Sequence, residues 1–329
     1  MAKTLANRKV GIIGCGFVGS ACAFSLMRSG LFSEMVLIDY DKPRAEGEAI
    51  DIAHGVPLSS PMDIYAGDYP DLKDASVIVI TAGARQKEGQ TRLDLVKDNV
   101  AIFKSIIPQI NDSGFSGVLL IVTNPVDILT DVAMQLSNLP ENRVIGSGTV
   151  LDSARLKYAL GKVMGIDPRH VHARMIGEHG DSEFPNWGSA NVSGISIDEC
   201  LRKVGNEHPF DKMDEIADNV RNSAYEIIEK KGFTNYGIAA CVTSILESIV
   251  RDGKSIMTVS SRVEKLYDAD GVVMSMPAII GKDGVEGKIP IRLNFDERRQ
   301  LKQSADVMRA VMAEIVLQDS TKKKQPSAK

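Results

Sequence analysis

The stretch Gly14-Cys15-Gly16-Phe17-Val18-Gly19 sets the architecture of the N-terminal half, because it joins the apolar run Lys9–Ile13 to the small, apolar run Ala21–Met27. A buried strand, a GxGxxG turn and a helix in this order are typical of a dinucleotide-binding unit. The first glycine permits a tight turn, the second lets the backbone approach a pyrophosphate, and the third lets helix and strand pack closely. Phosphates are expected at the helix N-terminus, where free N–H groups favour anions. The residues of the turn that are predicted to contact the cofactor are Gly14, Gly16, Phe17, Val18 and Gly19.

An acidic residue after the next strand indicates which dinucleotide is bound. The predicted strand Met35–Ile38 is followed by Asp39, twenty residues after Gly19. A carboxylate at this place accepts hydrogen bonds from both hydroxyls of the adenosine ribose and repels a 2′-phosphate, so the predicted cofactor is NAD rather than NADP. The alternative is an aspartate that only caps the turn before Pro43.

Strands and helices continue to alternate as far as Gly148. Continuous apolar strands between helices predict an α/β fold with a parallel, doubly wound sheet, which is a Rossmann domain. Ligands of such sheets lie at the carboxyl ends of the strands, so Thr81-Ala82-Gly83 and Thr123-Asn124 are predicted to line the cofactor site. The other elements of this half are predicted as helices at about 44–54, 93–110 and 127–137 and strands at about 63–66, 76–81, 118–122 and 144–145.

Longer helices and a mixed, turn-rich β region follow Gly148 and predict a second, α+β domain that holds the substrate. We therefore divide the chain into a nucleotide-binding domain (1–148), a substrate domain (149–318) and a disordered basic tail (319–329). The second domain is predicted to contain helices at about 152–164, 211–231, 236–250 and 296–317, strands at about 257–263 and 271–277, and a turn at 281–287.

Composition argues against several other classes of protein. The 39 basic and 43 acidic side chains give a net charge of −4, which argues against a nucleic-acid-binding surface. The four cysteines form no CxxC pair, which favours a reducing, cytoplasmic setting. Glycines interrupt the apolar run after Lys9, so we predict no targeting segment and no membrane span. His170 and His172 have no nearby cluster of further ligands, so no metal site is predicted.

A single histidine in the loop Ile176–Glu183 is the predicted proton donor. His179 lies there between glycines and carboxylates, and the reference histidine pKa of about 6.5 suits proton exchange near neutrality. Asp152 and Arg155 are three residues apart on a predicted helix and therefore point the same way. Such an aspartate can hold an imidazole, and such an arginine can grip a substrate carboxylate through two hydrogen bonds. The alternatives are a surface-loop histidine and a solvated Asp–Arg pair.

The charged, glycine-bounded segment Gly83–Arg92 joins a buried strand to a helix and is predicted to act as a hinged lid. Its closure would bring Arg92 to a ketone oxygen and exclude water, which strengthens charge–charge interactions in the site. An ordinary solvated loop is the alternative for any charged connector.

These motifs together resemble the lactate/malate dehydrogenase family, and within it the L-lactate dehydrogenases, over nearly the whole chain. The motifs are Gly14–Gly19 with Asp39, Thr81-Ala82-Gly83 with Arg92, Asn124-Pro125-Val126-Asp127, Leu151–Arg155 and Gly177–Ser182. The resemblance implies hydride transfer between NAD and C2 of pyruvate or L-lactate, and a homotetramer built on a dimer. The resemblance also implies the roles of the site residues. His179 would be the proton donor, Asp152 its partner, Arg155 the residue that holds the substrate carboxylate, and Arg92 the residue that polarises the carbonyl. Asn124 and Thr234 would line the pocket.

Two other functions remain open alternatives. Malate dehydrogenases of the family carry an arginine six positions before Arg92, whereas this chain has Gln86. A dicarboxylate substrate would leave an unpaired charge in the closed site, so the expected substrate is pyruvate, with Gln86 beside it. The alternative from a different class is a catalytically silent NAD-binding protein, which the presence of Asp152, Arg155, His179 and Arg92 disfavours.

The family resemblance also implies an allosteric anion site. Fructose 1,6-bisphosphate activates many bacterial members through a basic residue two positions after the clamping arginine and a histidine seven positions before the catalytic one. The corresponding residues here are Lys157 and His172. Lysine in place of the usual arginine keeps the charge but loses the bidentate fork. The alternative is a solvated helix lysine and a packed strand histidine.

Overall fold

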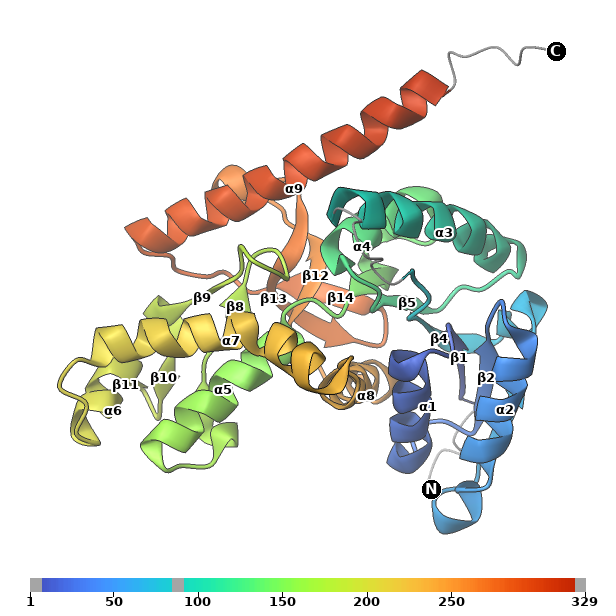
Figure 1. Ribbon diagram of the computed structural model, residues 1–329, viewed down its shortest axis with the longest axis horizontal. Helices are drawn as coiled ribbons and strands as arrows, with labels where there is room; N and C mark the ends of the chain where they lie inside the picture. The colour runs from blue at the N-terminus through green and yellow to red at the C-terminus, as the bar shows by residue number, and fades with distance from the viewer. Residues whose placement is uncertain (1–7, 85–91, 323–329) are drawn as a thin grey trace.

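The computed structural model describes residues 8–84 and 92–322, and its centre is a nine-stranded sheet between helices (Figure 1). Neighbouring strands in the order β6-β5-β4-β1-β2-β3 all pair in parallel, as the alternation of strands and helices predicts. The chain changes direction across the sheet between β1 and β4, which is the place where sheets of this kind bind their ligands. The parallel strands are β1 (Lys9–Ile13), β2 (Glu34–Ile38), β3 (Asp63–Ala66), β4 (Ala75–Ile80), β5 (Val118–Ile121) and β6 (Val144–Gly146).

Alternate residues of the central strands enter separate cores on the two faces of the sheet, because successive side chains of a strand point to opposite sides. Ile12 of β1 and Val79 of β4 belong to one core, whereas Ile13 and Ile80 belong to the other. In Figure 1, α9 slants across the upper part of the molecule, and its C-terminal part rises above α3 in this view. The first core receives α1 (Phe17–Ser29), α2 (Lys42–Ala53) and α8 (Tyr236–Val250), and the second receives α3 (Arg92–Asp112), α4 (Val126–Leu136) and α9 (Phe295–Lys322).

Three antiparallel strands from the C-terminal half extend the same sheet. β12 (Ser255–Arg262) pairs with β13 (Val273–Gly281), which pairs in turn with β14 (Gly284–Lys288). β12 joins the parallel strands through the antiparallel pair of Ser260 with Gly146. The sheet therefore crosses the predicted domain boundary at Gly148, and both cores contain residues from the two halves. The domain limits at Gly148 stay a prediction, and the hydrophobic cores on both faces of the sheet continue across this boundary.

A third core belongs to the C-terminal half alone. Leu156, Leu160 and Met164 recur every four residues on the inner face of one helix, as an amphipathic helix requires, and pack against Val171 and Ile216 among others. The elements around this core are the helices α5 (Val150–Met164), α6 (Ile197–Lys203) and α7 (Pro209–Lys231), the sheet of β7 (Val171–His172), β10 (Asn191–Val192) and β11 (Ile195–Ser196), and the hairpin of β8 (Met175–Ile176) and β9 (Phe184–Pro185).

The structure corrects two predictions near the C-terminus. The segment 281–287 is not a turn throughout, because the strand β14 begins at Gly284 and its buried Val285 pairs with Ile280. The last helix continues through Lys322 into the segment predicted to be disordered, since no glycine or proline interrupts α9. Residues 323–329 lie outside the described residues. The strand predicted around His172 is present as β7, whereas the two-residue strands β8–β11 were not predicted because they are too short for a periodic pattern.

Among residues 8–84 and 92–322, no helix combines the length and the apolar composition that a membrane crossing requires.

Candidate active site

His179, Asp152 and Arg155 form one connected group, although the histidine comes from a loop and the other two from α5. Nδ1 of His179 lies 2.7 Å from Oδ2 of Asp152, and the other oxygen, Oδ1, accepts a hydrogen bond of 2.8 Å from Nη1 of Arg155. The Asp152 side chain is 2% exposed and that of His179 is 24% exposed, so the aspartate lies behind the histidine. The geometry is that of a carboxylate that orients an imidazole.

The charges of this group shift the protonation equilibria of its members. Burial alone would lower the pKa of His179, but the charge and hydrogen bond of Asp152 outweigh it and the pKa lies well above its ordinary value of 6.5. Burial alone would raise the pKa of Asp152, but His179 and Arg155 hold it below its usual range. The arrangement therefore favours an imidazolium beside an ionised carboxylate.

A buried aspartate fixes the backbone of the catalytic loop. Oδ2 of Asp127, in the first turn of α4, accepts a 2.7 Å hydrogen bond from the backbone N–H of His179. The next residue towards the N-terminus is tied as well, because the N–H of Glu178 donates to Oγ of Ser304 in α9. Burial raises the pKa of Asp127 to about 6. The sequence offered Asp127 only as part of a motif, and its contact with His179 depends on a fold that brings residues 52 positions apart together.

The glycine-rich turn has the close contacts that its sequence predicts. Gly14 has a φ of 102°, and a Cβ atom there would lie 2.4 Å from the backbone nitrogen of Ala82. A Cβ atom on Gly19 would lie 1.8 Å from the carbonyl oxygen of Gly14. At Gly16, by contrast, a Cβ atom would meet nothing within 4 Å. Gly16 is also the residue before α1, and no side chain caps this helix end. The open space above Gly16 therefore lies beside backbone N–H groups that no side chain binds.

Asp39 lies directly beside this turn and binds its backbone. Oδ2 accepts a 2.6 Å hydrogen bond from the N–H of Cys15, and Oδ1 accepts one of 3.0 Å from the N–H of Asp41. Asp39 therefore does cap the turn, as the alternative interpretation states. Each carboxylate oxygen has two lone pairs, so these bonds leave room for hydrogen bonds to a ribose as well. Arg44 approaches the same place and donates from Nε to the carbonyl oxygen of Cys15 at 2.7 Å.

The two predicted strand-end segments meet beside the turn. Oγ1 of Thr81 donates to the carbonyl oxygen of Gly14 at 2.7 Å, and Oγ1 of Thr123 donates to that of Ala82 at 2.8 Å. Adding a Cβ atom to Gly83 would place it 2.4 Å from the Thr123 methyl group. The predicted cofactor residues from β4 and β5 therefore form one continuous surface with the glycine turn.

One residue of this surface was not predicted. Asn99 of α3 is buried, its Oδ1 accepts from the N–H of Ala84 at 2.7 Å, and its Nδ2 donates to the carbonyl oxygen of Asn124 at 2.8 Å. It thus joins the base of the predicted lid to the predicted substrate residue Asn124. The sequence does contain a sign of this role. Asn99 lies on the same apolar helix face as Val96 and Phe103, and a buried asparagine needs polar partners.

The remaining predicted substrate residues are placed less completely. Arg92 is the first residue of α3, but its side chain and the whole of Gln86 lie outside the described residues. Thr234 is half-buried in the connection between α7 and α8. The residue before it, Phe233, stacks on Phe17 of the glycine turn with ring centroids 3.9 Å apart. The predicted substrate loop and the predicted cofactor turn are therefore in direct contact.

Lys157 and His172, the predicted anion site, have different environments. Lys157 and Arg174 line a cavity of about 470 Å³ between α5, α8 and β12. Burial and the charge of Arg174 lower the pKa of Lys157. His172 is exposed on β7, opposite Asn191. The alternative of a packed histidine is therefore wrong for His172, whereas Lys157 is half-buried and its role stays a prediction.

Comparisons of the sequence and of the structure with known proteins point to the same family. Residues 8–146 match the lactate/malate dehydrogenase NAD binding domain, and residues 149–318 match the alpha/beta C-terminal domain of the same family. The chain is 50% identical to the L-lactate dehydrogenase of Thermoanaerobacterium saccharolyticum, over 93% of this chain and 99% of the relative. It is 48% identical to that of Priestia megaterium, over 92% and 95% of the two chains. The crystal structure of the minor L-lactate dehydrogenase from Enterococcus mundtii has a TM-score of 0.90 at 37% identity, covering 94% of this chain and 98% of that one.

Proposed function

The chain belongs to the lactate/malate dehydrogenase family and is an NAD-dependent L-lactate dehydrogenase, and from this premise we propose that His179 exchanges the proton with the substrate. The observation that carries the proposal is the 2.7 Å contact between Nδ1 of His179 and the buried Asp152. Because Asp152 occupies Nδ1, the opposite ring nitrogen, Nε2, is the one that faces the substrate. Asp152 keeps the ring oriented and stabilises its charged form.

The other roles follow from the same geometry. When bound, NAD carries the hydride to and from C2 of the substrate. His179 gives its proton to the substrate oxygen as pyruvate becomes L-lactate and takes it back in the reverse direction. Arg155 uses Nη1 for Asp152, and its remaining N–H groups hold the substrate carboxylate. Arg92 polarises the substrate carbonyl, and Asn124 and Thr234 line the pocket.

The residues of the glycine turn fit the cofactor. The open space over Gly16 is the cradle that a side chain would fill, and it lies at the uncapped N-terminus of α1. Backbone N–H groups at this helix end would hold the pyrophosphate of NAD. Asp39, which already binds the backbone of Cys15 and Asp41, would accept hydrogen bonds from the ribose hydroxyls.

The pH dependence of the two directions tests the role of His179. Pyruvate reduction needs the protonated ring, so kcat/KM is expected to be constant at low pH and to fall as the pH rises through the pKa of His179. Lactate oxidation needs the neutral ring, so its kcat/KM is expected to rise with pH. Because Asp152 raises this pKa, both inflections are expected above about pH 6.5. Steady-state rates in both directions measure them, and two profiles that run in the same direction contradict the assignment.

We further propose that an anion activates the enzyme, with fructose 1,6-bisphosphate as the ligand and a homotetramer as the responding assembly. The support is the pair of cations, Lys157 and Arg174, on one cavity, with the exposed His172 on the strand that precedes Arg174. Cations that face each other across a two-fold axis oppose assembly until an anion neutralises them.

The cysteines are unpaired, which supports a cytoplasmic location.

The activation is expected to lower the KM for pyruvate. Pyruvate saturation curves and sedimentation with and without fructose 1,6-bisphosphate, between about pH 5.5 and 7.5, measure the two effects. Lys157→Ala is expected to abolish the response, whereas Lys162→Ala on the same helix is the matched control. Identical curves and identical sedimentation over this range exclude the activator.

A further inference from the structure

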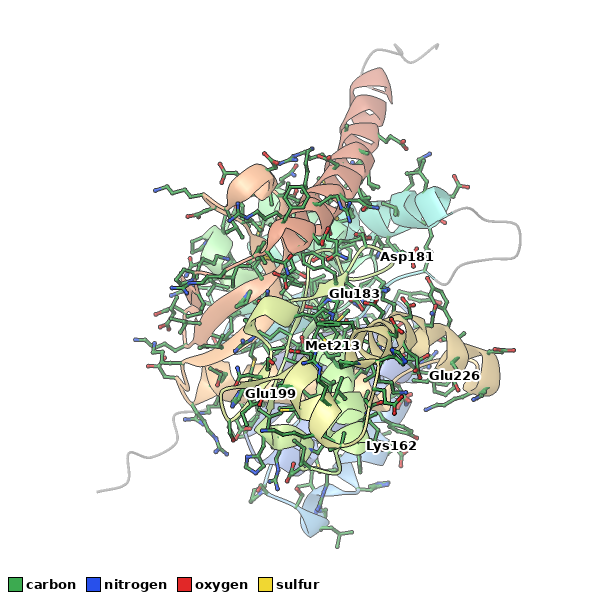
Figure 2. The ribbon with its side chains drawn as sticks, turned by 90° about the vertical axis from the view of Figure 1, so that its left-hand side faces the viewer. Lys162, Asp181, Glu183, Glu199, Met213 and Glu226 are labelled. Carbon is green, nitrogen blue, oxygen red and sulfur yellow. The ribbon has the colours of Figure 1, made fainter. Side chains whose placement is uncertain are left out.

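A second buried carboxyl group faces the ring of His179. Glu183 directly precedes β9 and is 3% exposed, and Figure 2 shows it among the packed side chains near the middle of the view. Its Oε2 lies 3.7 Å from Nδ1 of His179 and has no hydrogen-bond partner among the described residues. Asp152 lies 2.7 Å from the same nitrogen. Two carboxyl groups therefore face one ring nitrogen, which has a single proton to donate.

The two carboxyl groups do not ionise equally. Asp152 has two charged partners, His179 and Arg155, which keep its pKa below the usual range despite burial. Glu183 has no such pair of partners. Burial, together with the charge of Asp152, outweighs the attraction of His179 and raises its pKa to about 7. Glu183 is therefore largely protonated in mildly acidic solution and ionised in alkaline solution.

We propose that Glu183 is a positioning residue for the proton transfer, which acts through His179 by adding a second negative charge beside the imidazolium when its own proton leaves to solvent. With Glu183 protonated, Asp152 alone stabilises the charged ring. With Glu183 ionised, two carboxylates stabilise it, so His179 keeps its proton to higher pH and pyruvate reduction continues there. The proposal rests on the proposed role of His179 as proton donor.

Other charged groups surround the pair but differ from Glu183 in what they bind. Asp127 of α4 binds the backbone of His179 and not its ring, and its pKa of about 6 places its ionisation below the alkaline range. Arg221 of α7 donates from Nη1 to the main-chain oxygen of Glu183 at 3.3 Å and pairs with Asp218. The carboxyl groups of the same loop bind hydroxyl groups: Glu178 binds Ser182, and Asp181 binds Tyr225.

The variant Glu183→Gln tests the proposal, because glutamine resembles the protonated form and cannot ionise. The alkaline inflection of kcat/KM for pyruvate is expected to move down by about one pH unit, which is a roughly tenfold loss of rate on the alkaline limb with little change in acid. The rise of lactate oxidation is expected to move by the same amount. Asp181→Asn removes an exposed carboxyl group from the same loop and is expected to leave both inflections in place.

If Glu183 only supports the fold of the loop, its variants are expected to behave differently. A loss of rate that is uniform with pH, with unchanged inflections, overturns the proposal for Glu183. Glu183→Asp restores the charge with a shorter side chain, so its inflection is expected between those of the wild type and Glu183→Gln. An aspartate variant that matches the glutamine variant also overturns it. If the wild type itself lacks the inflection, the role proposed for His179 fails instead.

A second measurement covers the case in which Glu183→Gln does not fold. The ring carbon signals of His179 in the wild type, assigned by their loss in a His179 variant, can be followed by NMR as a function of pH. Ionisation of Glu183 is expected to add a separate step near pH 7 before the ring itself loses its proton. A curve with a single step overturns the proposal.

Discussion

Replacing His179 by glutamine is expected to lower kcat for pyruvate reduction by roughly a hundred- to ten-thousandfold, the range that a positioned general acid contributes. Glutamine keeps a polar side chain of similar length but has no proton to exchange near neutrality. Asp152 keeps its ion pair with Arg155, so the pocket remains while the chemistry fails. Steady-state rates with pyruvate and NADH measure the loss.

Binding of NADH is expected to change little in this variant, because the glycine turn and Asp39 are separate from the catalytic loop. Enhancement of NADH fluorescence follows binding directly. His170→Gln, at an exposed position, is the matched control and is expected to keep the wild-type rate. A His179→Gln enzyme with near-wild-type kcat dismisses this histidine as the acid.

Replacing Gln86 by arginine is expected to raise the ratio of kcat/KM for oxaloacetate to that for pyruvate by at least a hundredfold. If Gln86 faces the substrate as predicted, its neutral amide offers no positive charge to the second carboxylate of oxaloacetate, and an uncompensated charge in a closed site costs about 3–5 kcal/mol. An arginine at this position supplies a bidentate partner. For pyruvate the same arginine faces a methyl group, so its own burial becomes unfavourable and the rate with pyruvate falls.

The neighbouring segment provides the control for this experiment. Gln90→Arg adds the same charge to the predicted lid at a different position and is expected to leave the ratio near that of the wild type. Arg85 and Lys87 flank Gln86 in the sequence, so a shift of the segment by one residue would supply a cation from them instead. An unchanged ratio in Gln86→Arg contradicts the assignment of Gln86 to the substrate pocket.

Local sequence patterns predict most of the nucleotide-binding half, because its strands, turns and helices alternate over short distances. The GxGxxG turn and Asp39 were both recognised from local spacing, while their direct contact is seen only in the structure. The partners of β12 were not predictable in this way, since a strand pattern states that a strand exists but not which edge it joins. The pairing of Ser260 with Gly146 spans more than a hundred residues and depends on the whole fold.

The candidate site shows the same division between local and tertiary information. Asp152 and Arg155 are recognisable because helical spacing places them on one face. Asp127 appears in the sequence only as part of a motif and Glu183 only as an acidic residue of the loop, and the contacts of both with His179 are seen only in the structure. Burial depends on elements far along the chain, so the carboxyl groups that tune the histidine are found from the structure.

The continuous sheet also determines how this enzyme can be recombined with its relatives. Its six parallel strands and its three antiparallel strands β12, β13 and β14 form one hydrogen-bonded sheet, although the two groups come from different halves of the chain. A chimera joined at Gly148 therefore keeps the native neighbour of β6 only if β12 is compatible with the new nucleotide-binding half. Without that neighbour, β6 becomes an open edge with Val144 and Ile145 beside it, and open edges promote association between chains. The nucleotide-binding half is thus not a portable module, and the smallest exchangeable unit includes β12, β13 and β14.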